Sequence, residues 1–190
     1  MIDYVFGYAS LVALNEPTAV SGRLHGFRRR WGVAMNNWEG GDRVKHWLDR
    51  DTGERPRVRV AYLDIYEDAE YAVNGLALPV DAERLAALDA REINFRRMDV
   101  TAAFERVPCK RAPDAERPLR VFTYVGLDAA RERCRLGLEE GNTFVSRSYL
   151  SEVRRAFEQL GLDALVEFDR TTDPLPFPEL NLLRVEGRSR

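Results

Sequence analysis

The chain has 190 residues, of which 45% are hydrophobic and 32% charged, and a formal net charge of -2. These proportions are typical of a globular protein that buries its own core and exclude a disordered chain. The near-neutral charge gives no electrostatic reason to expect nucleic acid or an anionic membrane as a partner. No apolar run is long enough to span a bilayer. The sequence says nothing about oligomeric state.

The amino-terminal residues and the cysteines indicate a cytoplasmic protein. Residues 1–4 lack the basic and apolar regions of a signal peptide. Cys109 and Cys134 show no spacing typical of a disulfide framework or a zinc site. With only His25 and His46 in the chain, a histidine-rich metal site is also hard to build. We therefore expect reduced thiols, no metal and no cofactor.

The first predicted element is a short buried strand that ends in a turn of small residues, Val5-Phe6-Gly7-Tyr8-Ala9-Ser10-Leu11. A helical turn is expected next, over residues 11–14. Small residues allow consecutive backbone N–H groups to approach a ligand and form an anion-binding concavity. Glycine and serine also form ordinary strand-to-loop turns, and these residues alone favour that simpler interpretation.

Residues 19–35 are expected to form strands with bends, as in a curved sheet or barrel. Apolar and polar residues alternate irregularly there, and three glycines interrupt the pattern: Gly22, Gly26 and Gly32. A loop is expected over residues 36–42. Three tryptophans cluster around it: Trp31, Trp38 and Trp47. They could form a lid over a substrate, but aromatic side chains more often belong to the core, which we favour.

The middle of the chain predicts a hairpin-type turn over 49–56, with Gly53 at a position that needs a positive φ. A strand over 57–65, an acidic turn over 67–70 and a second strand over 71–79 follow. Asp81 is a good N-cap for a helix that ends near residue 89.

The remaining elements are predicted from periodicity. Strict alternation predicts a half-buried strand over 96–107, and residues 108–118 form a polar excursion. The further predicted elements are a strand over 119–125, helices over 129–140 and 148–160, and an extended tail over 173–190. No repeat and no linker divides the chain, so we expect one compact α+β domain over residues 1–190.

Most kinds of catalytic chemistry find no support in the sequence. Ser10 lacks the G-x-S-x-G elbow of a serine hydrolase, and the segment around Gly7 is not a dinucleotide-binding fingerprint. Carboxylate chemistry remains, and Glu92 is the main candidate because it lies between a helix end and a strand start. From the residues alone, a salt bridge to a neighbouring arginine is the favoured interpretation. The alternative is a carboxylate that faces a pocket.

Two stretches together resemble the γ-glutamylcyclotransferase-like family. Tyr8-Ala9-Ser10-Leu11 is similar to the family's amino-terminal Tyr-Gly-Ser-Leu turn, and Leu88-Asp89-Ala90-Arg91-Glu92 to the run that carries its catalytic glutamate. The order and distance of the two agree with the family. Three more segments resemble family motifs: Asn74-Gly75-Leu76-Ala77, Arg96-Arg97 with the strand after it, and Ser148-Tyr149-Leu150.

The sequence departs from the family pattern at two positions. Ala9 stands where glycine is usual, which requires a negative φ at that residue. Phe95 stands where tyrosine is usual, so a hydroxyl is missing there.

The resemblance implies a curved mixed sheet that closes into a small β-barrel with flanking helices. It also implies a cofactor-free enzyme that cyclises the γ-glutamyl group of a small molecule to 5-oxoproline and releases an amine or amino acid. Glu92 is then the general acid and base, and the backbone of Tyr8, Ala9, Ser10 and Leu11 binds the substrate. Tyr149 either contacts the substrate or Glu92, or belongs to the core.

Two alternatives stay open. One is a non-catalytic binding or structural domain of the same fold. The other is an enzyme that removes a γ-glutamyl protecting group in small-molecule metabolism. Residues 38–47 and 108–118 are where specificity for the leaving group would lie, and the sequence does not choose among leaving groups.

Overall fold

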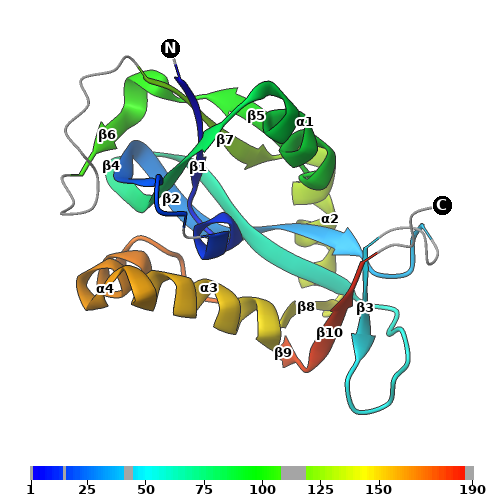
Figure 1. Ribbon diagram of the computed structural model, residues 1–190. Helices are drawn as coiled ribbons and strands as arrows, with labels where there is room; N and C mark the ends of the chain where they lie inside the picture. Colours follow the sequence, from blue (N-terminus) through cyan, green and yellow to red (C-terminus); the bar gives the residue numbers. More distant parts are fainter. Residues whose placement is uncertain (1, 15, 41–44, 108–118, 187–190) are drawn as a thin grey trace.

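The computed structural model describes residues 2–14, 16–40, 45–107 and 119–186, and Figure 1 shows their arrangement. In these residues eight strands form one mixed sheet: β1 (Ile2–Gly7), β2 (Val20–Asn36), β4 (Arg59–Val80), β5 (Phe95–Asp99), β6 (Phe104–Arg106), β7 (Leu119–Gly126), β8 (Thr143–Ser146) and β9 (Glu179–Leu180). A small second sheet pairs β3 (His46–Asp49) with β10 (Leu182–Val185).

Four α-helices surround the sheets in the described part of the chain: α1 (Ala82–Arg91), α2 (Asp128–Glu139), α3 (Arg147–Leu160) and α4 (Leu162–Arg170). Two 3₁₀ helices, η1 (Ser10–Leu14) and η3 (Thr101–Ala103), join strands. In Figure 1, α3 and α4 run along the lower side of the large sheet, whereas α1 and α2 lie at its upper right. None of the described helices has the length and apolar character needed to span a membrane.

The large sheet is curled into a half-barrel. Its strand order is β5-β7-β1-β4-β2-β6, with β8 and β9 continuing from another part of β4. The two ends of this order, β5 and β6, are joined by residues 100–103 alone, and a link of that length reaches only about 15 Å. The edges must therefore approach each other. The predicted α+β class and the curved mixed sheet are confirmed.

The long hairpin of β2 and β4 corrects two predictions. Residues 19–35 form one strand of 17 residues instead of several, and its bends are register shifts near Gly26 and Gly32. The predicted acidic turn over 67–70 is wrong, because these residues belong to β4, a single strand of 22 residues. The pairing passes from Ala72 directly to Glu67, so residues 68–71 bulge out of the ladder. Glu67 and Glu70 are exposed there.

The strand predicted over 96–107 is also interrupted, because the chain there passes from one edge of the sheet to the other. β5 pairs with β7, and β6 pairs with β2. Between them the Asp99 carboxylate accepts hydrogen bonds from the Thr101 N–H at 3.0 Å and the Thr101 hydroxyl at 2.7 Å. This local capping favours a helical turn at the point where the alternating pattern predicted a continuous strand.

Several predicted elements are confirmed. The helical turn, the strand at β7 and the helices α2 and α3 form within one residue of their expected bounds. The first strand also forms, but it begins at Ile2 and not at Val5. Asp81 caps α1 and accepts a hydrogen bond from the Arg84 N–H at 2.8 Å. Gly53 has a φ of 74°, as its turn requires. Six of the described elements were not predicted: β3, β8, β9, β10, α4 and η3.

The core fills the inside of the curled sheet and extends under α3. Phe6, Leu24, Ile65 and Phe157 are fully buried in it. A second cluster lies beneath α1. Trp31 and Trp47 are buried, as expected for core tryptophans, and Trp38 is half-buried.

The carboxyl-terminal segment predicted as an extended tail contains the short strands β9 and β10, which pair with β8 and β3. Its residues 187–190 lie outside the described residues, as do the excursion 108–118 and Cys109. Cys134 is a buried free thiol.

Candidate active site

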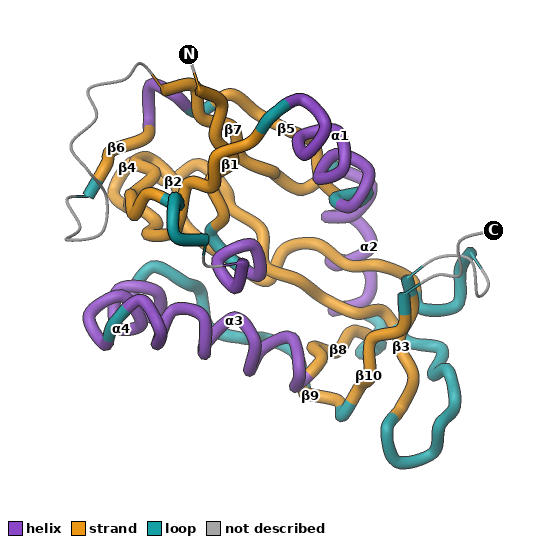
Figure 2. The backbone as a smooth tube through the Cα atoms, in the orientation of Figure 1, coloured by secondary structure: helices purple, strands orange, loops and turns teal. Residues whose placement is uncertain are grey.

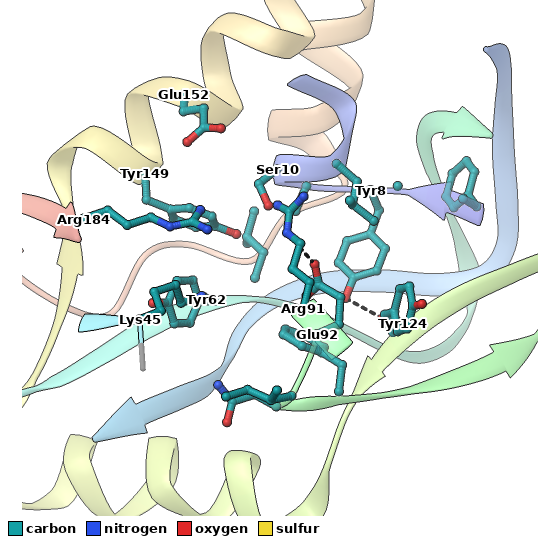
Figure 3. Close-up of a pocket in the computed structure, with 18 of the residues that line it drawn as sticks. Tyr8, Ser10, Lys45, Tyr62, Arg91, Glu92, Tyr124, Tyr149, Glu152 and Arg184 are labelled. Atoms are coloured by element: carbon teal, nitrogen blue, oxygen red, sulfur yellow. Dashed lines mark hydrogen bonds and ion pairs between the residues drawn. The ribbon is translucent and has the colours of Figure 1, made fainter. Parts of the chain in front are cut away.

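A pocket opens where β1 ends and η1 begins. Residues far apart in the sequence line it: the turn 6–11, Lys45 and Trp47, Tyr62 and Leu63, residues 91–95, Tyr124, Tyr149, Glu152, and Arg184. The close-up in Figure 3 shows how ten of these side chains surround the same space. Glu92, Tyr8, Ala9, Ser10, Leu11 and Tyr149, the residues that the sequence nominated, all line this one pocket.

The turn lies close to the sheet because two glycines leave room for it. A Cβ atom on Gly7 would stand 2.5 Å from the Leu11 Cβ, and one on Gly75 of β4 would overlap the carbonyl oxygen of Gly7. Gly7 pairs with Leu76, beside Gly75. Side chains at these two positions would push the turn away from β4, so both glycines set the place of the pocket wall.

Tyr8 is fixed at both its backbone and its side chain. Its carbonyl accepts a hydrogen bond from Arg29 Nε at 2.8 Å, and its hydroxyl donates to the Tyr124 carbonyl at 2.8 Å. Arg29 is completely buried and also donates to Thr171 Oγ1 at 2.6 Å and to Asn74 Oδ1 at 2.8 Å. The turn that follows Tyr8 is therefore held in one conformation by a buried guanidinium.

The backbone after Tyr8 enters the short helix η1. The Val12 N–H donates to the Ala9 carbonyl at 3.0 Å. The first N–H groups of a helix have no carbonyl acceptor within it, so the amides at Ala9, Ser10 and Leu11 are the hydrogen-bond donors that this wall can offer a ligand.

Glu92 is the residue that caps the carboxyl end of α1, with its N–H donating to the Leu88 carbonyl. Its side chain is only 17% exposed and its Oε1 lies 3.3 Å from Arg91 Nε. Both interpretations of Glu92 thus apply, since the carboxylate forms an ion pair and also lines the pocket. Burial raises the pKa of Glu92, while the positive charges of Arg91, Lys45 and Arg184 oppose that rise.

The end of α1 is tied to the sheet by Asp89. Its carboxylate accepts a hydrogen bond from the Tyr124 hydroxyl at 2.8 Å and pairs with Arg97 at 2.8 Å. Tyr124 in turn accepts the hydrogen bond of Tyr8 through its backbone. These contacts connect Glu92's helix, β7 and the turn, and they fix the carboxylate relative to the backbone of the turn.

The opposite wall is aromatic and basic. Tyr149 is buried and its ring meets that of Tyr62 edge to face, with centroids 5.2 Å apart. Trp47 Nε1 donates to the Tyr62 hydroxyl oxygen at 2.8 Å. Lys45 Nζ lies 5.0 Å from the centre of the Tyr62 ring, and Arg184 reaches the pocket from β10. Burial raises the pKa of Tyr149 well above its usual value, so this phenol is neutral.

Sequence analysis missed several residues of the pocket: Lys45, Tyr62, Tyr124, Glu152 and Arg184. No motif marks them, and Arg184 belongs to a segment expected to be a tail. The single signal is that the chain contains only two lysines, of which Lys45 is one. In the described residues no group of three or more histidine, cysteine, aspartate or glutamate side chains could hold a metal ion.

Comparison with known proteins reveals similarity of structure. No protein-family model matches the chain, and no curated protein matches it in sequence. A γ-glutamyl cyclotransferase structure superposes with a TM-score of 0.51 and 12% identity, covering 92% of this chain and 90% of its own. A γ-glutamyl cyclotransferase specific to glutathione from yeast gives 0.52 and 12%, covering 90% and 97%.

YkqA from Bacillus subtilis gives a TM-score of 0.51 and 15% identity over 93% of this chain, which corresponds to 56% of that protein. At such identities the likeness concerns the fold. The chain therefore has the γ-glutamylcyclotransferase-like fold that its two short motifs predicted.

Proposed function

We propose that this protein is a γ-glutamylcyclotransferase, which converts a γ-glutamyl compound to 5-oxoproline and a free amine without a cofactor. The observation that carries the proposal is that Glu92, a carboxylate with a raised pKa, lines the same pocket as the Tyr8–Leu11 turn. The two features were the basis of the resemblance, and Glu92 follows Leu11 by 81 positions in the sequence. The shared fold with γ-glutamyl cyclotransferases supports the same assignment.

The reaction needs little more than a folded substrate and one group that moves a proton. The α-amine of the glutamyl group attacks its own γ-carbonyl, a C–N bond closes the five-membered ring, and the C–N bond to the leaving amine breaks. Holding the chain in the attacking conformation removes most of the entropic barrier. The attacking nitrogen loses one proton before it attacks and a second as the ring amide forms. The leaving nitrogen gains one proton as its C–N bond breaks and a second when it is released as an ammonium ion, so the protons balance and no water is consumed.

Glu92 can accept a proton from the attacking nitrogen and then donate a proton to the leaving nitrogen. A carboxylate with a pKa raised toward neutrality accepts a proton from an ammonium more readily than an exposed glutamate does, and its acid form is a competent donor to the leaving nitrogen. The amides of Ala9, Ser10 and Leu11 are suited to hold the substrate carboxylate or the oxyanion that develops at the γ-carbonyl. Tyr149, as a neutral phenol, is suited to donate a hydrogen bond to either partner.

The non-catalytic alternative loses support from the position of Glu92. A structural or binding domain that had lost activity has no need for a largely buried carboxylate in the same pocket as the amides of the turn, because burying a charge costs free energy. Phe95 lines the pocket together with Glu92. The phenylalanine side chain therefore still forms part of the pocket wall, although it lacks the hydroxyl of the usual tyrosine. A catalytic role is therefore the better explanation for the arrangement.

The test measures 5-oxoproline release from γ-glutamyl amino acids, glutathione and γ-glutamyl amines. We expect release from at least one class, and a loss of about 10²- to 10⁴-fold in kcat for Glu92→Gln, the range typical of a removed general acid and base. Glu158→Gln, which changes an exposed carboxylate on α3 that does not line the pocket, is the control and retains release. Absence of release from every substrate, or unchanged release by Glu92→Gln, would contradict the proposal.

A further inference from the structure

The pocket has two chemically different ends. Figure 3 shows Tyr8, Ser10 and Glu92 gathered on one side, and Lys45, Tyr62 and Arg184 on the other. The first end holds the elements of the proposed reaction. The second is formed by the small β3–β10 sheet and β4. Its two cations, Lys45 and Arg184, act on the pKa of Glu92 through their charges, but neither is among the groups that the proposed reaction assigns to the reacting atoms.

Lys45 is a cation inside the pocket without a carboxylate partner. None of the ion pairs among the described residues includes it, and its recorded contact is with the face of the Tyr62 ring. Burial, and then the nearby Arg184 guanidinium, lower the pKa of Lys45, and the opposing charges of Glu92 and Glu186 do not offset them. An ammonium group held in this way is costly unless an anion joins it. A bound anion beside Nζ would favour the charged ammonium and so counteract the decrease in the Lys45 pKa that burial and Arg184 cause.

Arg184 supplies a second cation at the same end. Its Nη2 pairs with Glu186 at 2.6 Å, but the Glu186 side chain is 69% exposed, and such exposed pairs contribute little. The guanidinium has five N–H donors. It can therefore bind a ligand carboxylate either in addition to the ion pair with Glu186 or in place of it. The charge of Glu152 at the mouth opposes anions, but Glu152 is exposed and solvent screens it.

We propose that Lys45 and Arg184 form a carboxylate-binding subsite for the leaving half of the substrate, so that the enzyme prefers γ-glutamyl compounds whose leaving amine carries a carboxylate. This inference rests on the proposed function. The glutamyl half must occupy the end with Glu92 and the turn, since its amine and γ-carbonyl both react there. The leaving half then extends toward Lys45 and Arg184.

The experiment uses two substrates that differ only by the carboxylate, γ-glutamyl-alanine and γ-glutamyl-ethylamide. We expect kcat/KM to be about tenfold or more higher for γ-glutamyl-alanine, the effect of one charge-assisted hydrogen bond. Lys45→Met and Arg184→Met each lower this ratio, and the double variant brings it to about one. Arg135→Met, which removes an exposed cation on α2, is the matched control and leaves the ratio as in the wild type.

Two results would overturn the subsite while leaving the proposed function intact. One is a wild-type ratio near one or in favour of the ethylamide. The other is an equal loss of activity toward both substrates in Lys45→Met and Arg184→Met, which would assign these cations to the glutamyl carboxylate instead.

A binding measurement separates this inference from the failure of catalysis. In Glu92→Gln, calorimetry gives the Kd of both compounds without turnover. Binding of γ-glutamyl-alanine about tenfold or more tighter than of the ethylamide, lost when Lys45→Met is added, supports the subsite even if the wild type releases no 5-oxoproline. Equal affinities would refute it.

Discussion

Glu92 has to be held firmly at the end of α1 while its carboxylate stays largely out of water. The Arg91 side chain, 3.3 Å away, partly compensates the charge, and the Glu92 N–H completes the last turn of the helix. Burial still outweighs these effects and raises the pKa of Glu92. A residue whose ionised form is disfavoured by folding reduces stability, which is common where a side chain serves catalysis.

Replacement of Glu92 should therefore stabilise the protein at neutral pH. Because its folded-state pKa lies above the unfolded value, the folded protein holds the Glu92 proton more tightly, and stability falls as pH rises from the ordinary glutamate pKa through the raised one. Glu92→Gln removes this cost. We expect a higher Tm than the wild type at pH 7 and a difference that shrinks toward pH 4, measured by calorimetry.

The control is Glu132→Gln on α2, whose carboxyl group has a pKa lowered by its hydrogen bond to Arg135. This variant should show no gain at pH 7. A Glu92→Gln protein less stable than the wild type at pH 7 would mean that the ion pair with Arg91 outweighs the cost of burial.

Arg29 shows how a buried cation is stabilised by neutral groups. Its guanidinium is surrounded by carbonyl, amide and hydroxyl oxygens and by the rings of Phe157 and Phe168, whose centres lie 5.1 and 4.9 Å from Cζ. Each N–H group that meets an oxygen replaces a hydrogen bond lost to water. The arrangement connects the turn at Tyr8 to α3 and α4, far along the chain.

At the scale of elements, the position of the pocket depends on how closely β1 approaches β4. The pair meets at Gly7 and Gly75, where the backbones leave no room for a side chain. The turn that begins at Tyr8 continues directly from this contact. Any change in the spacing of the two strands is therefore transmitted to the amides of the turn.

Gly75→Ala tests this coupling. The added methyl group overlaps the Gly7 carbonyl, so the strands must separate, at a cost of about 1–3 kcal/mol in the free energy of unfolding. We expect urea denaturation to show this loss and KM for the γ-glutamyl substrate to rise.

Gly141→Ala provides a comparison at a distant turn. A methyl group there meets open space, but the φ of 64° is unfavourable for alanine, so a loss of about 1–2 kcal/mol with unchanged KM is expected. A Gly75→Ala protein with wild-type KM would show that the turn does not depend on this contact.

At the scale of the molecule, the pocket joins a large sheet to a small one. The amides of β1 and β4 lie inside an extensive ladder. Among the described strands, β3 and β10 pair only with each other, and the buried Trp47 and Leu182 anchor them. In Figure 2 this small sheet lies at one end of the molecule. Two-stranded sheets depend on such packing for their stability.

Hydrogen exchange should reflect this difference. We expect the amides of β3 and β10 to exchange faster than those of β1 and β4 in the free protein. Saturating γ-glutamyl-alanine, added to Glu92→Gln so that no turnover occurs, should slow exchange in β3 and β10 because Lys45 and Arg184 border these strands. The amides of α2, none of whose residues lines the pocket, serve as the internal control. Unchanged exchange in both strands at saturation would contradict a ligand contact there.

Local patterns predicted the elements whose structure depends on near neighbours. The Asp81 cap, the apolar face of α3 and the alternation in β7 each describe a few turns or residues, and each is confirmed. The acidic segment 67–70 and the strand over 96–107 failed because distant pairing decided them. β2 pairs with β4 on both sides of the first, which became a bulge within one long strand. The two edges of the sheet divided the second.

By itself the sequence determined the α+β class, the turn at Tyr8 and the candidate carboxylate at Glu92, because short motifs and periodicity contain that information. Only the tertiary structure decided that these two stretches face one pocket, and that Lys45 and Arg184 complete its other end. The curl of the sheet and the pairing of β3 with β10 bring these residues together in the pocket. Contacts between residues over a hundred positions apart follow from packing and leave no local pattern in the sequence.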